Sequence, residues 1–198
     1  MARTKSDSTS VTDRPRVGSY TTPGLTHEDG HEMAEILQAR LNALNDLALT
    51  LKHVHWNVVG PHFIGVHEMI DPHVVEVRDM VDETAERIAT LGAAPLGTPG
   101  SIVANRTWED YSLTRGSTDE HLGALDVVYV GLLEDHRKSQ EAAAELDPVS
   151  EDMLIGQIKQ LELFHWFVRA HLENYSGALS TGSATSEKSA AKRAASRH

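Results

Sequence analysis

The apolar residues of this sequence recur every three or four positions in four long stretches, a period that predicts amphipathic helices. The first helix is expected to begin near Thr26, where Asp29 follows in a capping-box-like position, and to end before Gly60. The second is expected to run from Phe63 to Gly92. The predicted core face of the first helix consists of Leu37, Leu41, Leu44, Ala48 and Leu51, and that of the second of Phe63, Val66, Ile70, Val74, Val77, Val81, Ala85 and Ile88.

The third helix is expected to start at Ser117, with Glu120 in capping-box register, and the fourth to open at Asp147. Between the second and third helices lies a connection of about 25 residues that is rich in Gly, Pro and Ser and is predicted to hold one short helix near Thr107 to Tyr111. A connection of this length can cross a whole bundle. The sequence therefore predicts an all-α, ferritin-like four-helix bundle with a long crossover between the second and third helices.

Pro72 interrupts the pattern of the second helix, because proline removes one backbone hydrogen bond from a helix interior. Asp71 and Pro72 together also fit an N-cap followed by the first residue of a new helix, in which case the Asp71 carboxylate would serve as a cap. Val66 and Ile70 keep the apolar register across this point. A continuous, kinked helix is therefore the favoured interpretation.

The two ends of the chain differ in composition from its middle. Residues 1–24 are rich in Ser, Thr, Arg and Pro and are expected to form a flexible tail, whereas 25–178 hold the bundle. Residues 179–198 contain few large apolar side chains and are expected to form a second flexible tail. The basic residues of this second tail are Lys188, Lys192, Arg193 and Arg197.

The composition narrows the class of protein further. With 18 basic and 29 acidic residues the chain carries a formal charge of −11, while both predicted tails are basic. An acidic body with basic ends favours cations inside and polyanions outside, although an acidic surface that serves only solubility remains the alternative. The absence of cysteine excludes disulfides and thiolate metal sites. Without a signal sequence or a membrane-spanning run, we expect a cytoplasmic protein.

A second, polar stripe on the Phe63–Gly92 helix contains two pairs of metal-ligand types, His67 with Asp71 and Asp82 with Glu86. The pairs share a face, but about 16 Å of helix separates Asp71 from Asp82, so one chain cannot bring both pairs to one ion. If two copies of this helix pack antiparallel about a two-fold axis, His67 and Asp71 of one chain meet the Asp82 and Glu86 pair of its partner. An exposed charged face is the alternative.

His55 continues the inward face of the first helix and can add a further imidazole to this set. Two imidazoles and three carboxylates, without sulfur, suit iron or manganese, with zinc also possible. Carboxylates supply the negative charge that a ferric product requires. The pattern therefore indicates a metal site that two subunits share.

The run KHVHWNVVGPHFIGVHEMIDPHVVEVRDMVDETAERIATLG, residues 52–92, resembles the signature of the Dps family of mini-ferritins, the DNA-binding proteins from starved cells. The resemblance covers about residues 25–175. It implies a hollow homododecamer with ferroxidase sites at its two-fold interfaces, which oxidises Fe²⁺, preferably with hydrogen peroxide, and stores a ferric mineral without an organic cofactor. Carried over by position, the ligands are His55, His67 and Asp71 from one subunit and Asp82 and Glu86 from its partner.

The same resemblance gives roles to residues around the site. It implies that Trp56 lies beside the iron, where it can take up an oxidising equivalent, with interface packing as the alternative. Asp135 aligns with acidic residues that line three-fold iron-entry pores, and Asp126 and Glu134 are weaker candidates. For these three acidic residues a solvated helix face is the alternative.

Two further features complete the prediction. Glu162 and His165 have the spacing of half a di-iron motif of larger ferritins, but the second helix lacks the matching half, so His165 is expected to be a hydrogen-bonded core residue.

The basic C-terminal residues can neutralise DNA phosphates without reading sequence, and twelve copies would add avidity. We therefore expect a nucleoid-associated ferroxidase. The alternative is a DNA-compacting structural protein with little or no turnover.

Overall fold

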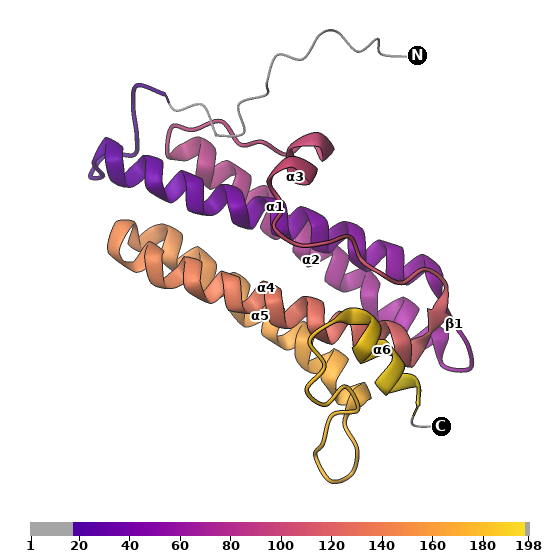
Figure 1. Ribbon diagram of the computed structural model, residues 1–198. Coiled ribbons are helices and arrows are strands. Elements are labelled where there is room, and N and C mark those ends of the chain that lie inside the picture. Colours follow the sequence, from indigo (N-terminus) through magenta and orange to yellow (C-terminus); the bar gives the residue numbers. More distant parts are fainter. Residues whose placement is uncertain (1–17, 197–198) are drawn as a thin grey trace, which may run out of the picture.

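The computed structural model describes residues 18–196, most of which lie in helices (Figure 1). Two long helical hairpins make the bundle: α1 (His27–Asn57) with α2 (Phe63–Thr90), and α4 (Thr118–Leu146) with α5 (Pro148–Leu172). The other described elements are the short helices α3 (Pro99–Asn105) and α6 (Glu187–Ala195) and the strands β1 (Val58–Val59) and β2 (Gly116–Ser117). The predicted four-helix bundle is therefore confirmed. No helix of the described part has the length and apolar character needed to cross a membrane.

Three of the four long helices, α1, α4 and α5, begin at residues whose side chains cap them. The Thr26 hydroxyl accepts a hydrogen bond from the Asp29 backbone N–H, and Ser117 with Glu120 forms a complete capping box. Asp147 accepts two backbone hydrogen bonds at the start of α5, and a proline follows it in the first turn. Each cap satisfies backbone donors that a helix start leaves free, so these three predicted boundaries are confirmed.

Helix α2 continues through Pro72, and Asp71 lies inside the helix rather than at its N-cap. The continuous helix favoured by the apolar register is therefore confirmed, and the Asp71 side chain is not used as a cap. The apolar faces of the long helices pack into two clusters along the bundle. One cluster includes Leu51 and Tyr129, and the other includes Leu37.

The connection between α2 and α4 passes along the α1–α2 hairpin to the opposite end of the bundle (Figure 1). It ends in β2, which pairs in parallel with β1, so that Val58 lies opposite Gly116. This pairing ties the start of α4 to the end of α1. The long crossover expected from the sequence is confirmed.

The prediction of a short helix near Thr107 to Tyr111 is wrong, because the short helix of this connection, α3, ends at Asn105 and so precedes that segment. The Trp108 indole N–H donates to Asp46 on α1 at 2.8 Å. The Arg106 guanidinium contacts both Asp46, at 3.5 Å, and Asp110, at 2.5 Å. These contacts hold the segment in an irregular conformation. The spacing of apolar residues does not reveal such contacts, because they join the segment to a distant helix.

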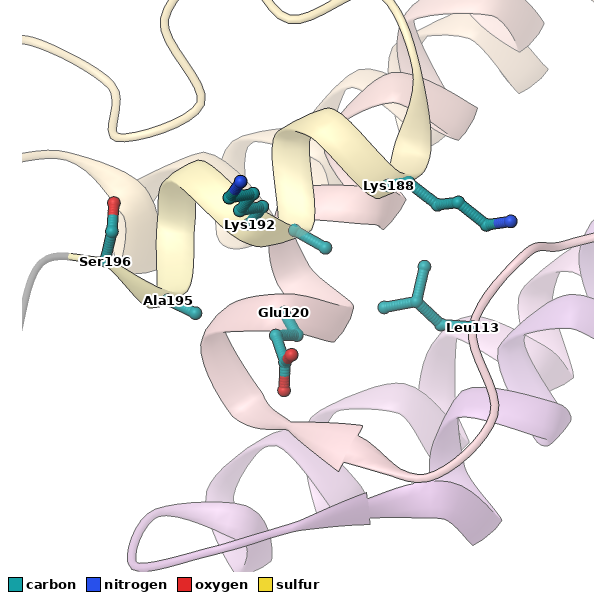
Figure 2. Close-up of a pocket in the computed structure, with 7 residues that line it drawn as sticks. Leu113, Glu120, Lys188, Lys192, Ala195 and Ser196 are labelled. Atoms are coloured by element: carbon teal, nitrogen blue, oxygen red, sulfur yellow. The ribbon is translucent and has the colours of Figure 1, made fainter.

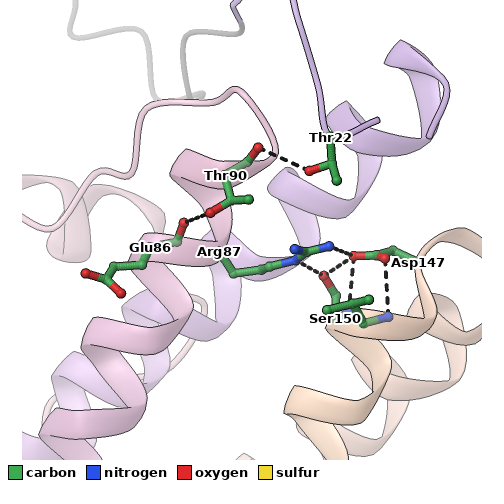
Figure 3. Close-up of polar contacts among 7 residues, drawn as sticks. Thr22, Glu86, Arg87, Thr90, Asp147 and Ser150 are labelled. Carbon is green, nitrogen blue, oxygen red and sulfur yellow. Dashed lines mark hydrogen bonds and ion pairs between the residues drawn. The ribbon is translucent and has the colours of Figure 1, made fainter. Parts of the chain in front are cut away.

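The two hairpins are joined at one end by a buried ion pair (Figure 3). Arg87 of α2 contacts Asp147 at 2.5 Å and donates to the Ser150 hydroxyl at 3.0 Å. Burial raises the pKa of Asp147, but hydrogen bonds from Ser150 and Arg87 outweigh this effect, so the net pKa lies below its ordinary value. The carboxylate therefore stays ionised and links α2 to the turn between α4 and α5.

Part of the predicted N-terminal tail packs against this same end of the bundle. The Gly18 backbone N–H donates to the Gly92 carbonyl at 2.6 Å, and the Thr22 hydroxyl donates to the Thr90 carbonyl at 3.2 Å (Figure 3). Residues 1–17 of the predicted tail lie outside the described residues.

The expectation of a flexible tail at 179–198 is wrong for most of this segment, because α6 forms there and packs on α4. Ala190, Ala191 and Ala194 are buried in the contact. Gly123 of α4 permits the close approach, since a Cβ at this position would lie 2.8 Å from the Ala190 carbonyl oxygen. This segment contains few large apolar side chains, but a stripe of alanines that faces a glycine is enough to hold a short helix against the bundle.

Polar contacts fix α6 at both of its ends. The Glu187 carboxylate accepts a hydrogen bond from the Ser112 backbone N–H at 2.6 Å. The Arg193 guanidinium donates to the Thr181 carbonyl at 3.3 Å. Arg197, the last basic residue assigned to the tail, lies outside the described residues.

Gly123→Ala should displace α6, because the new methyl group would overlap the Ala190 carbonyl. We expect limited trypsin digestion to cut after Lys188 and Lys192 severalfold faster in this variant while the bundle stays intact. The matched control is Gly131→Ala in the same helix, where a Cβ would meet no atom within 4 Å. Equal cleavage rates in the two variants would contradict the packing described here.

Candidate metal centre

Two histidines from adjacent helices form the centre of the candidate site. The Nδ1 atom of His55 lies 2.8 Å from the backbone carbonyl oxygen of His67, and the Nδ1 atom of His67 lies 2.9 Å from that of His55. The rings stack with their centroids 3.6 Å apart. A carbonyl oxygen only accepts hydrogen bonds, so each Nδ1 must carry the proton. Each Nε2 therefore keeps its lone pair, the arrangement typical of histidines that bind a metal.

Asp71 lies beside this pair on the exposed face of α2. Its carboxylate is 3.3 Å from Nδ1 of His55 and 2.8 Å from the ammonium of Lys52. The hydrogen bond from Lys52 lowers the pKa of Asp71, and the positive charge of Lys52 acts in the same direction. The Lys52 ammonium also lies 5.7 Å from the centre of the Trp56 ring. The structure therefore brings three of the predicted ligands together and adds a cation that sequence analysis missed.

Asp82 and Glu86 lie exposed on the same helix, about three turns beyond Asp71. Among the described residues, no group of three or more His, Asp or Glu side chains is arranged to hold a metal ion within one chain. The predicted set is thus divided into two parts: His55 of α1 with His67 and Asp71 of α2, and Asp82 with Glu86 further along α2.

The face that carries these ligands also exposes large apolar side chains. Trp56 is 71% exposed, Ile64 is 52% exposed and Val75 is 58% exposed. Ile64, Asp71 and Val75 follow one another at intervals of seven and four residues, so they share one side of α2. Apolar groups of this size beside charged ligands are typical of a surface that another protein covers.

The acidic residues assigned to a pore have different surroundings. Asp135 is partly exposed, and its carboxylate contacts Lys138 at 2.9 Å. Glu134 is exposed. Asp126 is buried and is not available as a pore residue, because it accepts hydrogen bonds from His165 at 2.7 Å and Arg169 at 2.9 Å. His165 is therefore a hydrogen-bonded core histidine, as expected from the sequence.

The basic residues expected in a mobile tail lie on α6 instead. Lys188 and Lys192 line a shallow groove of about 400 Å³ between α6 and the segment that contains Leu113 (Figure 2). Arg193 is exposed on the same helix. The α6 helix therefore has an alanine face toward α4 and a basic face toward solvent.

Comparison with known proteins identifies the class to which this fold and ligand set belong. The family model described as a ferritin-like domain matches residues 34–178. The DNA protection during starvation protein of Mycolicibacterium smegmatis is 57% identical over 176 residues, which cover 89% of this chain and 96% of the relative. The fine tangled pili major subunit of Haemophilus ducreyi is 49% identical over 165 residues, which cover 83% of this chain and 87% of the relative.

The solved structure of DpsA14 from Streptomyces coelicolor has a TM-score of 0.83 and 59% identity, and the match covers 84% of this chain and 99% of that one. Mycobacterium smegmatis Dps has a TM-score of 0.84 and 56% identity, with 85% and 97% covered. The fold is thus that of a ferritin-like protein. Within this class, the chain belongs to the Dps family of mini-ferritins, as the resemblance of residues 52–92 implied.

Sequence analysis missed two features of the site that only tertiary packing creates. The reciprocal hydrogen bonds of His55 and His67 join two helices through backbone carbonyls, and residue types do not reveal such contacts. The position of Lys52 near the site was weakly indicated by the sequence, because Lys52 precedes Trp56 by four residues and therefore shares its helix face. A lysine within reach of a ligand carboxylate could have been proposed from that spacing.

Asp126→Asn should destabilise the fold by about 2 kcal/mol at neutral pH. Burial raises the pKa of Asp126, but hydrogen bonds from His165, Arg169 and Thr181 prevail and lower it to about 2. A lowered pKa contributes stability above the unfolded value of about 4, and this contribution is lost as the pH falls toward 2. Denaturant unfolding of the wild type and the variant should therefore converge over this range. Glu134→Gln, an exposed change on the same helix, should leave stability unchanged at every pH.

Proposed function

We propose that this protein is a ferroxidase and iron-storage mini-ferritin whose catalytic sites form between subunits. Two copies pack their α2 helices antiparallel about a two-fold axis, so that His55, His67 and Asp71 of one chain face Asp82 and Glu86 of its partner. A two-fold interface repeats every contact, so each dimer has two identical sites. The exposed Trp56, Ile64 and Val75 are then buried between the subunits, which supports this arrangement.

The reciprocal hydrogen bonding of His55 and His67 is the observation that carries the proposal. It fixes both rings as Nδ1–H tautomers with free Nε2 lone pairs before any metal arrives. Ordering two freely rotating imidazoles would otherwise oppose binding, so their fixed positions favour capture of Fe²⁺. Carboxylates complete a mixed oxygen and nitrogen set suited to iron in both oxidation states.

Fe²⁺ and hydrogen peroxide are the substrates of the reaction. Two Fe²⁺ ions give one electron each, the peroxide O–O bond breaks, and two protons complete two water molecules. The products are two Fe³⁺ ions and no hydroxyl radical, so the reaction removes both Fenton reagents. Trp56, beside the site, packs in the interface and can take up a stray oxidising equivalent.

The ammonium group of Lys52 balances the negative charge of the candidate ligand Asp71. In the metal-free chain its ammonium neutralises Asp71 at 2.8 Å. Arrival of Fe²⁺ replaces this ion pair, and the lysine ammonium keeps its contact with the Trp56 ring, over which it already lies at 5.7 Å from the ring centre. The Asp71 carboxylate therefore stays ionised at every stage.

The assembled form is a hollow homododecamer that stores the ferric product as mineral. Acidic residues guide Fe²⁺ to its interior, with Asp135 as the candidate in this chain because Asp126 is committed to the core. The overall charge of −11 supports cation handling. The protein acts in the cytoplasm and is associated with the nucleoid.

Asp82→Ala combined with Glu86→Ala should abolish fast peroxide-dependent Fe²⁺ oxidation while leaving assembly largely intact. Both side chains are exposed in the single chain, so their loss creates no cavity. The rate is measured by stopped-flow absorbance of the ferric product. Asp79→Ala with Glu83→Ala removes the same charge from the same helix and should leave the rate unchanged.

Complementation tests whether the site is shared. A His67→Ala, Asp71→Ala chain and an Asp82→Ala, Glu86→Ala chain are each expected to be inactive alone. Mixed dimers formed by unfolding and refolding them together contain one intact site, so activity should return. Continued inactivity of correctly assembled mixtures would show that one chain supplies all the ligands. Wild-type oxidation at the rate of the buffer blank would leave the DNA-compacting structural protein as the function.

The basic face of α6 supports a second role in DNA binding. Lys188, Lys192 and Arg193 are exposed on one helix that is held to the bundle by its alanine face. Cations presented on an anchored helix can neutralise neighbouring phosphates without reading sequence. One chain would bind weakly, whereas twelve copies on a particle bind with avidity.

Lys188→Ala with Lys192→Ala should weaken retardation of duplex DNA in a gel and reduce its dependence on salt, because fewer phosphates are neutralised. Fe²⁺ oxidation should be unaffected. Arg137→Ala with Lys159→Ala removes two exposed charges away from α6 and from the proposed interface and serves as the control for net charge. If both pairs change DNA binding equally, the effect comes from overall charge and not from α6.

A further inference from the structure

A second group of metal-ligand side chains lies on the first turns of α1, outside the predicted ferroxidase set. His27, Glu28, His31, Glu32 and Glu35 line a surface hollow of about 590 Å³. No hydrogen bond or ion pair within the described residues engages the side chains of His27, Glu28 or Glu32. The polar side chains of this group are therefore free to bind a ligand from solution.

The spacing of these residues places three of them in one row. His27, His31 and Glu35 follow one another at intervals of four, so successive Cβ atoms lie about 5–6 Å apart on one face. Nδ1 of His31 is already 3.9 Å from the Glu35 carboxylate. Two imidazoles one turn apart can reach a single ion, as they do in helical zinc sites.

The backbone under this row is held in place. The Thr26 side chain caps the helix, and Met33 and Ala34, within its first turns, are buried in the bundle. Gly30 packs directly on Thr21, since a Cβ on Gly30 would lie 2.2 Å from the Thr21 hydroxyl oxygen. The side chains are thus presented from a fixed platform, which lowers the ordering needed on binding.

We propose that His27, His31 and Glu35 bind one divalent transition-metal ion per chain. Two imidazoles and a carboxylate are a borderline set that suits Zn²⁺ and Fe²⁺ and does not suit Mg²⁺ or Ca²⁺. Glu28 and Glu32 flank the row and add negative charge. In the structure no three of these side chains converge on one point, so binding requires rotation of exposed side chains but no movement of the backbone.

This site is distinct from the predicted ferroxidase centre. His31 and His55 are on the same helix but 24 residues apart, which is about 36 Å along its axis. The inference therefore does not rest on the proposed ferroxidase function. The first residues also have the His-Glu-x-x-His spacing of zinc hydrolases, but here the row lies open on a helix start. We infer a binding site and no hydrolytic reaction.

The test uses the assembled protein in which His67→Ala, Asp82→Ala and Glu86→Ala have removed the ferroxidase ligands. Zn²⁺ is titrated against a coloured chelator, and Fe²⁺ is titrated anaerobically in a second arm. We expect one Zn²⁺ per chain in this background. Adding His27→Ala or His31→Ala should weaken the affinity at least about tenfold, since even the loss of an outer partner of a ligand has this effect.

The matched control is His171→Ala in the same background, because His171 is also an exposed helical histidine. It should leave Zn²⁺ stoichiometry and affinity unchanged. All of these side chains are on the surface, so the variants should fold and assemble. The proposal is overturned if the background protein binds no Zn²⁺, or if His31→Ala binds it as well as His171→Ala does. Binding of Zn²⁺ without Fe²⁺ would identify a zinc site, and binding of both would identify a general transition-metal site.

Discussion

The rigid length of helix α2 is the constraint on which the functional interpretation depends. A helix holds its side chains at fixed intervals, so the Asp71 and Asp82 regions remain about 16 Å apart whatever their rotamers. One chain therefore offers an imidazole-rich part and a carboxylate part, and neither part alone makes an iron site. The bundle core keeps α2 helical through Pro72, and the proposed iron chemistry therefore depends on a second subunit.

Features specified by local chemistry could be predicted from the sequence. Thr26, Ser117 and Asp147 cap helices through their own neighbours, so the boundaries follow from residue types. The position of α3 and the docking of α6 depend instead on contacts between distant segments, such as Trp108 with Asp46. In the site, the spacing of ligands was visible, while the orientation of the His55 and His67 rings was not, because backbone carbonyls of another helix determine it.

The docking of α6 changes how the basic C-terminal residues would act on DNA. Charges on a flexible tail reach far but lose conformational entropy when they bind. Charges on a helix held by Gly123 and by the Glu187 and Arg193 hydrogen bonds are already ordered. The acidic Glu120 lines the same groove as Lys188 and Lys192. The ordered helix therefore favours binding at lower entropic cost, whereas a nearby carboxylate repels the DNA phosphates and weakens that binding.

The two histidine groups of α1 differ in the way the fold controls them. At one end of the helix, His55 is buried, its tautomer is set by a carbonyl, and its partners come from another helix. At the other end, His27 and His31 are held only by their own helix and are open to solvent. An ordered, partly buried set discriminates between ions by geometry and can retain them through an oxidation. An open row selects mainly by ligand type and exchanges ions readily, so the surface row suits reversible capture and the interface suits chemistry.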